Sequence, residues 1–498
     1  MNQIDYTALL NLAWPEITLV IAALVVLALD ISLLRQARLQ TRFAIAASLA
    51  SIGCSIAIVQ LFHGLGQTSL LDGVLLSTPL VRCVQISILA LTIVTLLLTV
   101  TQKFTRNVGE FVLLILVATA GMLFLVATND LLVIFLSLET LSLSLYVLTA
   151  FDKSSAPAAQ ASLKYFLFGA MSAAFLLFGI SLLYGFSNST GLAAIATTLH
   201  GPSLNPLVII ALVATLIGFG FKVAAVPLHF WAPDVYQEAP APAAAFIATG
   251  SKVASFFVFF QVMVLGLAGA EGSAGFAHYL PGWVPAIVLM AVLSMMLGNL
   301  VAIVQTSLRR LLAYSAIAHA GYMLLAIASH SQQNLSALIF YVVTYALATL
   351  GIFAVLAAIE SQIGGDKLSH FDGLSRRAPF LSFCLALFLL SLAGIPPLAG
   401  FFSKFFLFIS VLQANPGSQV MLWLVILAIA MSAVSLYYYL RVLKRLYVTD
   451  TPAEAAPIRV PLFSQIVIGL LAAAVVLFGC APHLLLDWIV AAAKASGN

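Results

Sequence analysis

The sequence has very few charged residues for its length. Of its 498 residues, 8% are Asp, Glu, Lys or Arg, whereas 63% are hydrophobic, and the mean hydropathy is +1.13. A soluble domain carries about 25% charged residues, because its surface has to be solvated. The composition therefore excludes an ordinary soluble protein and indicates an integral membrane protein.

Cysteine is scarce, and motifs that bind metals, nucleotides or haem are missing. The four cysteines, Cys54, Cys83, Cys384 and Cys480, lie far apart in apolar runs without a CxxC pair, which is typical of small buried side chains. There is no glycine-rich phosphate loop, Walker motif or haem motif. We therefore expect no metal site and no cofactor in this chain. The net charge of +4 needs a membrane explanation rather than a nucleic-acid partner.

Long apolar runs dominate what the sequence does contain. Runs of about 20 apolar residues are typical of transmembrane helices, and we place fourteen along the chain. The predicted fold is therefore an all-α membrane protein with about 14 transmembrane helices. The expected spans are 14–34, 42–62, 78–101, 109–128, 131–151, 158–185, 205–229, 238–265, 280–303, 310–329, 334–360, 378–412, 420–446 and 461–490.

The basic residues test this count. Sixteen of the 21 Lys and Arg residues fall in loops that the assignment places on one face, and only Lys494 falls on the other. By the positive-inside rule the first face is cytoplasmic, so both termini are expected on the opposite side. An error of one span would scramble this pattern. The sixteen are Arg35, Arg38, Arg42, Lys103, Arg106, Lys153, Lys164, Arg309, Arg310, Lys367, Arg376, Arg377, Arg441, Lys444, Arg445 and Arg459.

Four ionisable residues lie inside apolar runs, namely Glu139, Lys222, Lys252 and Lys404. A charge at the bilayer centre costs about 2.5–3.5 kcal/mol on insertion scales. One explanation is a structural Glu–Lys pair, and another is a lysine that snorkels or faces a partner subunit. The functional explanation is a chain of titrating sites along a hydrated path. Burial favours a neutral lysine and a nearby carboxylate favours a charged one, so movement of the carboxylate would switch proton release.

Prolines interrupt two of the expected spans. Pro227 lies in span 7, and Pro396 and Pro397 lie in span 12. A proline inside a helix frees backbone carbonyls, and a bilayer tolerates these only where protein or cavity water satisfies them. Broken helices at matching places in two halves indicate a transport site.

The two breaks also predict an internal repeat. Each is the fourth helix in a set of five, and five is an odd number, so the two sets are expected to be inverted relative to each other. The lysines are not equivalent, because Lys222 precedes Pro227 by five residues and Lys404 follows Pro397 by seven. The predicted divisions are helices 1–3 in residues 1–108, a first repeat of helices 4–8 in 109–265, a second repeat of helices 9–13 in 280–446, and helix 14 in 461–490.

Two histidines fall near these charges. His229 follows the break in span 7, and His319 lies in the middle of span 10. Imidazole titrates near physiological pH, so both are candidates for passing protons. His319 is expected to bridge the Lys252 region to Lys404. A packing role is the alternative for both histidines.

Four long motifs carry a resemblance to a known family. They read "GFKVAAVPLHFWAPDVYQ", "SLKYFLFGA", "LRRLLAYSAIAHAGY" and "GIPPLAGFFSKF". They resemble the antiporter-like subunits of respiratory complex I, and most of all the subunit N group. The resemblance covers nearly the whole chain, most clearly from span 4 through span 13. It implies a proton-pumping module in the membrane arm of NADH:quinone oxidoreductase.

The resemblance assigns roles to the residues singled out above. The family's key glutamate in span 5 matches Glu139, and its lysines in spans 7, 8 and 12 match Lys222, Lys252 and Lys404. The lysine at position 404 favours subunit N, since the sister subunit M carries glutamate there. We also expect no long lateral helix of the kind that subunit L carries. The implied relay consists of Glu139, Lys222, Lys252, Lys404, His319 and His229.

The resemblance also implies a location and partners. The expected location is the bacterial inner membrane, with both termini on the periplasmic side. The expected partners are the lipid bilayer and other membrane-arm subunits, such as subunit M and small subunits such as K. FMN, iron–sulfur clusters and quinone would be bound by other subunits, so this chain would hold no redox centre.

One departure and three alternatives accompany this interpretation. The family usually has glycine where this chain has Glu238, and a hydroxyl residue where it has Ala241. A subunit of a multi-protein cation/proton antiporter, or of a membrane-bound hydrogenase, would share the fold and the Glu–Lys pattern. A stand-alone solute carrier would also use broken helices, but with polar substrate-binding residues at the midplane. A purely structural membrane scaffold is the third alternative.

Overall fold

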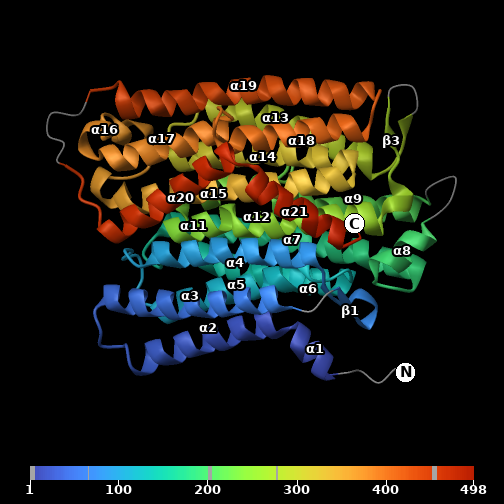
Figure 1. Cartoon of the computed structure of the whole chain (residues 1–498), viewed down its shortest axis with the longest axis horizontal. Coiled ribbons are helices and arrows are strands. Elements are labelled where there is room, and N and C mark those ends of the chain that lie inside the picture. Colours follow the sequence, from blue (N-terminus) through green and yellow to red (C-terminus); the bar gives the residue numbers. More distant parts are fainter. Residues whose placement is uncertain (1–5, 65–66, 200–204, 276–278, 451–456, 498) are drawn as a thin grey trace.

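The computed structural model describes residues 6–64, 67–199, 205–275, 279–450 and 457–497. Nearly parallel helices run from one end of the molecule to the other (Figure 1). Within the described ranges, 13 helices are long and apolar enough to cross a membrane. The broken pair α17 and α18 supplies a further crossing, so the prediction of about fourteen spans is confirmed. The chain is a multi-pass, all-α membrane protein.

The helices have the following bounds. They are α1 (Tyr6–Leu12), α2 (Trp14–Ser32), α3 (Leu39–His63), α4 (Pro79–Thr99), α5 (Val108–Val126), α6 (Leu131–Thr149), α7 (Ala156–Ser187), α8 (Leu192–Thr198), α9 (Pro206–Val223), α10 (Ala232–Glu238), α11 (Ala241–Ala248), α12 (Gly250–Gln261), α13 (Trp283–Ile303), α14 (Leu308–Ser329), α15 (Gln332–Ile363), α16 (Leu374–Arg377), α17 (Pro379–Ala393), α18 (Ala399–Ala414), α19 (Gln419–Tyr447), α20 (Leu462–Cys480) and α21 (His483–Ala495).

Short elements complete the described chain. Strands β1 (Thr68–Leu70) and β2 (Leu75–Ser77) form one antiparallel pair, and β3 (Ser273–Ala274) and β4 (Tyr279–Leu280) form another. A π-turn, η2 (Val262–Gly266), extends α12, and 3-10 turns lie at η1 (Leu71–Gly73), η3 (Ala268–Ala270) and η4 (Leu368–Phe371).

Side-chain caps fix where several helices begin. The first amide groups of a helix have no partner within it, and Ser, Thr, Asp or Asn side chains accept their hydrogen bonds. Asp130 accepts from the N–H groups of Leu132 and Val133 and so starts α6. The same role falls to Thr78 for α4, Ser155 for α7, Asn205 for α9, Ser307 for α14, Ser331 for α15 and Ser418 for α19.

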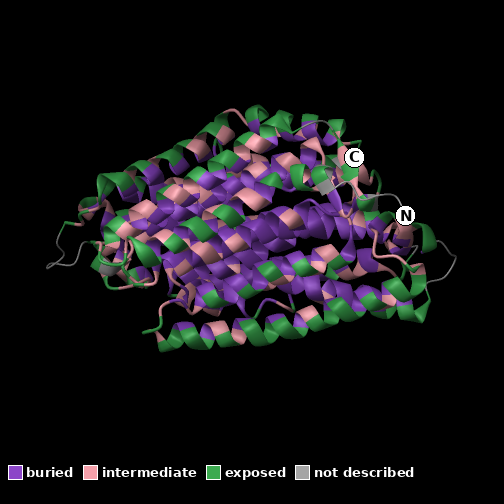
Figure 2. Ribbon diagram, turned by 90° about the horizontal axis from the view of Figure 1, so that it is seen from below, coloured by how far each residue is buried: buried purple, intermediate pink, exposed green. Residues whose placement is uncertain are grey.

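The core of the bundle is formed by α11, α12 and α14, which are almost entirely buried. Figure 2 shows buried residues through the middle of the bundle and exposed residues along its rims. The outer helices expose large apolar side chains, for example Phe166 and Leu167 on α7 and Trp423 on α19. Such faces suit contact with lipid or with neighbouring membrane subunits, because lipid tails are as apolar as these side chains.

The two proline-bearing breaks have the same backbone conformation. α9 ends before Ala224 and α17 ends before Gly394, and both residues are left-handed, with φ of +60° and +89°. Three residues after each of them comes a proline, Pro227 or Pro397, that follows a cis peptide bond. The two breaks therefore share the same local backbone pattern, a left-handed residue that is followed by a proline three residues later.

The hydrogen bonds at the two breaks match as well. The N–H of Ala225 donates to the carbonyl of Gly220 at 2.9 Å, and the N–H of Ile395 donates to that of Leu390 at 3.1 Å. Both bonds run from a residue to the fifth one before it, the ending of a Schellman motif. The backbone thus supports an internal repeat in which the breaks correspond residue by residue.

Two further breaks were not expected from the sequence. Expected span 8 divides into α11 and α12 at Thr249, whose φ and ψ are −123° and −82°. Expected span 14 divides into α20 and α21 at Pro482. The division at Thr249 places the start of α12, at Gly250, two residues before Lys252 and within the core of the bundle.

Both ends of the described chain lie at one end of the bundle. The side chain of Gln67 donates to the carbonyl of Ala495, and the N–H of Leu80 donates to the hydroxyl of Ser496 at 3.0 Å. Helix α1 contacts β2 at the same end. This arrangement requires an even number of crossings, in agreement with fourteen spans.

Candidate functional site

Lys222 lies in the last turn of α9, two residues before the break at Ala224. It is 7% exposed, and its ammonium group donates to the hydroxyl of Ser142 on α6 at 2.6 Å. Glu139 lies on the same helix, three residues before Ser142, and interacts electrostatically with Lys222. No ion pair joins the two within the described ranges. Lys222 therefore makes its hydrogen bond to α6, the helix that carries Glu139, but it does not contact Glu139 directly.

Lys252 lies in the first turn of α12, just after the break at Thr249. It is 1% exposed. Its ammonium group donates to the carbonyl of Ala316 on α14 at 3.0 Å and lies 5.5 Å from the ring centre of Tyr345 on α15. A backbone carbonyl and an aromatic face stabilise a cation that has no carboxylate partner in the described part of the chain.

His319 lies on α14, three residues after Ala316. Its Nδ1 atom shares a hydrogen bond of 2.8 Å with the hydroxyl of Tyr341 on α15, and its Nε2 atom lies 3.5 Å from the hydroxyl of Tyr439 on α19. The charges of Lys252 and Lys404 both act on its ring. His319 thus lies within electrostatic reach of both lysines, and its role as a bridge between them stays a prediction.

Lys404 lies on α18 and contacts the end of α17, where the helix is broken. Its ammonium group donates to the carbonyls of Leu392 and Ala393, each at 3.0 Å, and to the hydroxyl of Ser432 at 2.8 Å. It also lies 5.5 Å from the ring centre of Tyr322. The last carbonyls of a helix carry a partial negative charge and lack partners within the helix, so they stabilise the cation.

His229 lies in the segment between α9 and α10. It is 5% exposed, its ring lies 4.4 Å from that of Phe230, and it interacts with the backbone of Pro227. In the described ranges no hydrogen bond joins it to Lys222 or Lys252. The structure therefore places His229 at the break but outside the row of lysines, and its part in a relay stays a prediction.

An ionic cluster lies where α10 meets α7 and α14. Asp234 forms ion pairs with Lys164 on α7 and with Arg310 on α14. The neighbouring Arg309 pairs with Glu360 at the end of α15 and donates to the carbonyls of Gln237 and Ala239. These contacts tie the first half of the chain to the second at the end of the bundle that carries most of its basic residues.

Glu238, which replaces an expected glycine, lies within this ionic cluster. Partial burial raises the pKa of its carboxyl group, and the nearby carboxylate of Asp366 raises it further. The guanidinium of Arg309 acts in the opposite direction. The cluster thus contains a carboxyl group that holds its proton more readily than an exposed glutamate does.

Comparison with known proteins identifies the family. The model of the family "NADH:quinone oxidoreductase/Mrp antiporter, TM" matches residues 128–432. A protein of Acidobacterium capsulatum named NADH-quinone oxidoreductase subunit N 2 is 52% identical, and the match covers 98% of this chain and all of that protein. A subunit N 1 of Roseiflexus castenholzii is 40% identical over 81% of this chain and 77% of its own. The chain belongs to the NADH-quinone oxidoreductase subunit N family.

Solved structures agree with this membership. A chain of respiratory complex I from Thermus thermophilus with bound aureothin is 32% identical and superposes with a TM-score of 0.77, over 95% of this chain and 98% of that one. A chain of the Mrp complex from Dietzia is 20% identical with a TM-score of 0.82, over 97% of each chain. The second likeness shows a shared fold alone. The resemblance to the subunit N family that the motifs carried is confirmed.

If the two predicted repeats are aligned on their breaks, the offset between Lys222 and Lys404 becomes visible. Aligning Ala224 with Gly394 places Lys222 opposite Leu392 and Lys404 opposite Asp234. Lys404 donates a hydrogen bond to the carbonyl of Leu392 at the end of α17, whereas Asp234 forms an ion pair with Arg310 in the ionic cluster. The two halves therefore share a backbone break but use different charges at it.

Sequence reasoning missed two buried acids in the N-terminal helices. Asp30 accepts two hydrogen bonds from Arg42, at 2.8 and 2.7 Å, and one from the N–H of Gly109 at 2.8 Å. Glu16 accepts one bond from Gln85 at 3.0 Å, and its other oxygen is buried without a partner in the described residues. The signal that could have revealed them was the presence of two acids, Glu16 and Asp30, inside the first apolar run.

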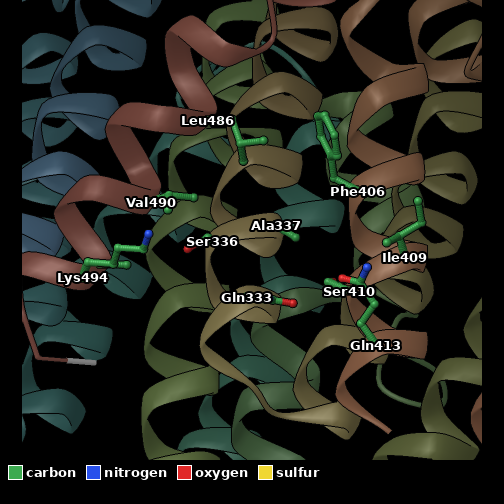
Figure 3. A pocket seen from close by; sticks show the side chains of 11 residues that line it. Gln333, Ser336, Ala337, Phe406, Ile409, Ser410, Gln413, Leu486, Val490 and Lys494 are labelled. Atoms are coloured by element: carbon green, nitrogen blue, oxygen red, sulfur yellow. The ribbon is translucent and has the colours of Figure 1, made fainter. Parts of the chain in front are cut away.

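Two cavities lie near the C-terminal helices. A cavity of about 310 Å³ lies between α15, α18 and α21 and contains one charged residue, Lys494 (Figure 3). Lys404 lines a second cavity of about 380 Å³, together with Ser432 and apolar residues of α18 and α19. Ile409 borders both. Lys404 thus borders a cavity next to the second helix break.

Proposed function

We propose that this chain is a proton-translocating membrane subunit of NADH:quinone oxidoreductase. The observation that carries the proposal is that each buried lysine lies at, or contacts, a break in a helix. Lys222 lies in the last turn of α9, and Lys252 lies in the first turn of α12. Lys404 donates hydrogen bonds to the carbonyls at the end of α17. Membrane proteins keep ionisable residues at such depth for ion pathways, and broken helices are typical of transport sites.

The neighbours of the lysines support proton transfer at their Nζ atoms. Ser142, Ala316 and Ser432 supply oxygen atoms that stabilise an ammonium group. When a neighbouring group becomes positively charged, the ammonium form becomes less favourable and the lysine releases a proton. The charges of Lys252 and Lys404 both act on the His319 ring, so a change of charge on His319 would act on both lysines in turn. Glu139 would control the charge of Lys222 in the same way.

The work that drives transfer would come from other subunits. We propose that FMN, iron–sulfur clusters and quinone are bound there and that this chain holds no redox centre. Its neighbours would be other membrane-arm subunits, such as subunit M and small subunits such as K. The basic face would be cytoplasmic, so that both termini lie on the periplasmic side of the bacterial inner membrane.

Copurification tests the assembly directly. An affinity-tagged copy of the full chain, expressed in its own cell, should purify with NADH-oxidising activity, because the subunit N family works within that complex. The rival is a subunit of a cation/proton antiporter, which the shared fold of the Mrp complex keeps open. A purified complex that exchanges sodium ions for protons and does not oxidise NADH would contradict the proposal.

A further inference from the structure

Helix α15 carries hydroxyl groups at every fourth residue along one face. Tyr341, Tyr345 and Thr349 are all buried, and residues four apart lie above one another on a helix. The same helix ends near Glu360, which pairs with Arg309 in the ionic cluster. From Tyr341 to Glu360 the helix rises by about 28 Å, at about 1.5 Å per residue. One helix therefore spans the distance from the ionic cluster to the centre of the bundle.

The deep end of this face contacts the central charged groups. Tyr341 shares its hydrogen bond with His319 at 2.8 Å, and Lys252 lies 5.5 Å from the ring centre of Tyr345. Helix α12, which carries Lys252, packs along α15 in the middle of the bundle (Figure 1). A proton that reaches Tyr345 is thus next to the Lys252–His319 pair.

Tyr236 of α10 joins the same face nearer the ionic cluster. It is fully buried, and its ring meets that of Phe353 on α15 edge-on, with 6.0 Å between their centres. Its hydroxyl and that of Thr349 lie near the hydroxyl of Tyr345 without a direct hydrogen bond to it. Tyr236 lies on α10, the helix that also carries Asp234 of the ionic cluster, so α10 reaches from that cluster to α15.

The hydroxyls of Tyr236 and Thr349 are not satisfied by the protein alone. Both are buried, and neither has a hydrogen bond of good geometry to a described residue. By contrast, Thr344 on the same helix donates to the carbonyl of Phe340 at 2.8 Å, the usual solution for a threonine in a helix. Buried hydroxyls of this kind are commonly bridged by an ordered water. The cluster is thus suited to a hydrated hydrogen-bonded chain.

We propose that Tyr236, Thr349 and Tyr345 form a proton-uptake column that links the carboxyl groups of Glu238 and Glu360 with the Lys252–His319 pair. The proposal rests on the proposed function, because it requires that Lys252 takes part in proton transfer. It gives Glu238 a role as the donor at the outer end of the column. The column lies where α10 packs against α15, and it shares no residue with the Glu139–Lys222 site.

The transfer leaves no charge on the column. Each hydroxyl accepts a proton from the preceding group or bridging water and gives its own to the next. The neutral amine of Lys252 gains a proton and becomes an ammonium group, which the Ala316 carbonyl stabilises. Glu238 loses a proton and becomes a carboxylate, which Arg309 stabilises electrostatically. Removal of one hydroxyl would interrupt the chain without removing a charge.

Paired substitutions at Thr349 separate a hydroxyl chain from simple packing. Thr349→Val keeps the shape and removes the hydroxyl, whereas Thr349→Ser keeps the hydroxyl and removes a methyl group. A column predicts that Thr349→Val and Tyr236→Phe slow coupled NADH-to-quinone turnover by about tenfold or more, and more strongly at higher pH, where protons are scarcer. It predicts that Thr349→Ser stays near the parent. Thr95→Val is the matched control, because Thr95 is a buried threonine on α4 whose hydroxyl donates to the carbonyl of Leu91 at 2.9 Å and so has no part in the column.

The measurement uses the whole complex in proteoliposomes, with NADH oxidation by an artificial acceptor as the check of assembly. The column is overturned if Thr349→Val and Tyr236→Phe keep the parent's turnover and pH profile, or if Thr349→Ser is as slow as Thr349→Val. Lys252→Ala is measured in parallel. If Lys252→Ala still pumps at the parent's rate, the proposed function itself fails, whereas loss of pumping in Lys252→Ala with a normal Tyr236→Phe overturns the column alone.

Discussion

Individual buried charges in this chain are stabilised to very different degrees. Asp30 has three hydrogen bonds, two of them from the guanidinium of Arg42. Glu16 has one, from the amide of Gln85, and one oxygen without a partner. Both residues are almost fully buried. Since removing one member of a buried ion pair leaves the other uncompensated, the two acids should respond differently to the same change.

Asp30→Asn should destabilise the chain, and Glu16→Gln should not. The first substitution removes the buried carboxylate that accepts three hydrogen bonds and leaves the half-buried guanidinium of Arg42 without its ion-pair partner, at a cost of about 1.5–3 kcal/mol. The second keeps a hydrogen-bonding group near Gln85 and removes a charge with little support. The measurement is the fraction of the chain that stays assembled in the purified complex after a graded heat challenge. Equal losses in the two variants would contradict this account.

At the scale of elements, the sequence predicted the breaks at Pro227 and Pro397 but not the one at Thr249. A proline cannot donate a hydrogen bond and fixes its own φ, so its effect is local and visible in the sequence. Thr249 has an ordinary backbone donor, and its dihedral angles are imposed by packing in the core. The same holds for Ser142 and Ser432, which become partners of lysines only through tertiary contact.

Gly400 is the glycine on which the second break depends. A Cβ atom there would lie 1.8 Å from the carbonyl oxygen of Ser391, whereas at Gly185 on α7 it would meet nothing within 4 Å. Gly400→Ala must therefore push α18 away from α17 and draw Lys404 off the carbonyls of Leu392 and Ala393. We expect a loss of about 1–3 kcal/mol in stability and impaired pumping.

Gly185→Ala is the control for that substitution. It should be neutral or stabilising by about 0.5–1 kcal/mol, because alanine favours a helix over glycine. Thermal stability of the purified complex and proton uptake in proteoliposomes measure both variants. A Gly400→Ala complex that pumps and melts like the Gly185→Ala complex would show that the close contact of α17 and α18 does not hold Lys404 in place.

For the whole molecule, sequence reasoning reached the fold and most of the ionisable groups inside it, but it missed the buried acids Glu16 and Asp30. Apolar runs and the distribution of arginine and lysine were sufficient for the span count, and four charges inside those runs were sufficient to nominate Glu139 and the three lysines. The order of contacts was beyond its reach. Lys252 and His319 are adjacent only because α12, α14 and α15 pack together, and the pairing of Asp234 with Lys164 and Arg310 joins three separate helices.

The structure arranges these groups in two sections, and no direct hydrogen bond between described residues joins one section to the other. Lys252, His319 and Lys404 form one, with hydroxyl groups of tyrosine and serine around them. Glu139, Ser142 and Lys222 form the other, and the contact between α9 and α12 is apolar, as in the stacked pair Phe219 and Phe259, with 5.1 Å between ring centres. A charge change at Lys222 would therefore act on Lys252 through the electric field or through water rather than through a direct hydrogen bond.

Whether Lys222 carries protons can be measured as the number of protons pumped per NADH oxidised by a Lys222→Ala complex in proteoliposomes. Oxidation of NADH by an artificial acceptor should be unchanged, since that reaction does not need the membrane arm. Quinone-coupled proton pumping should fall by about tenfold or more, because a buried transfer site has been removed. A Lys222→Ala complex that assembles and pumps as many protons per NADH as the parent would show that Lys222 carries none of them.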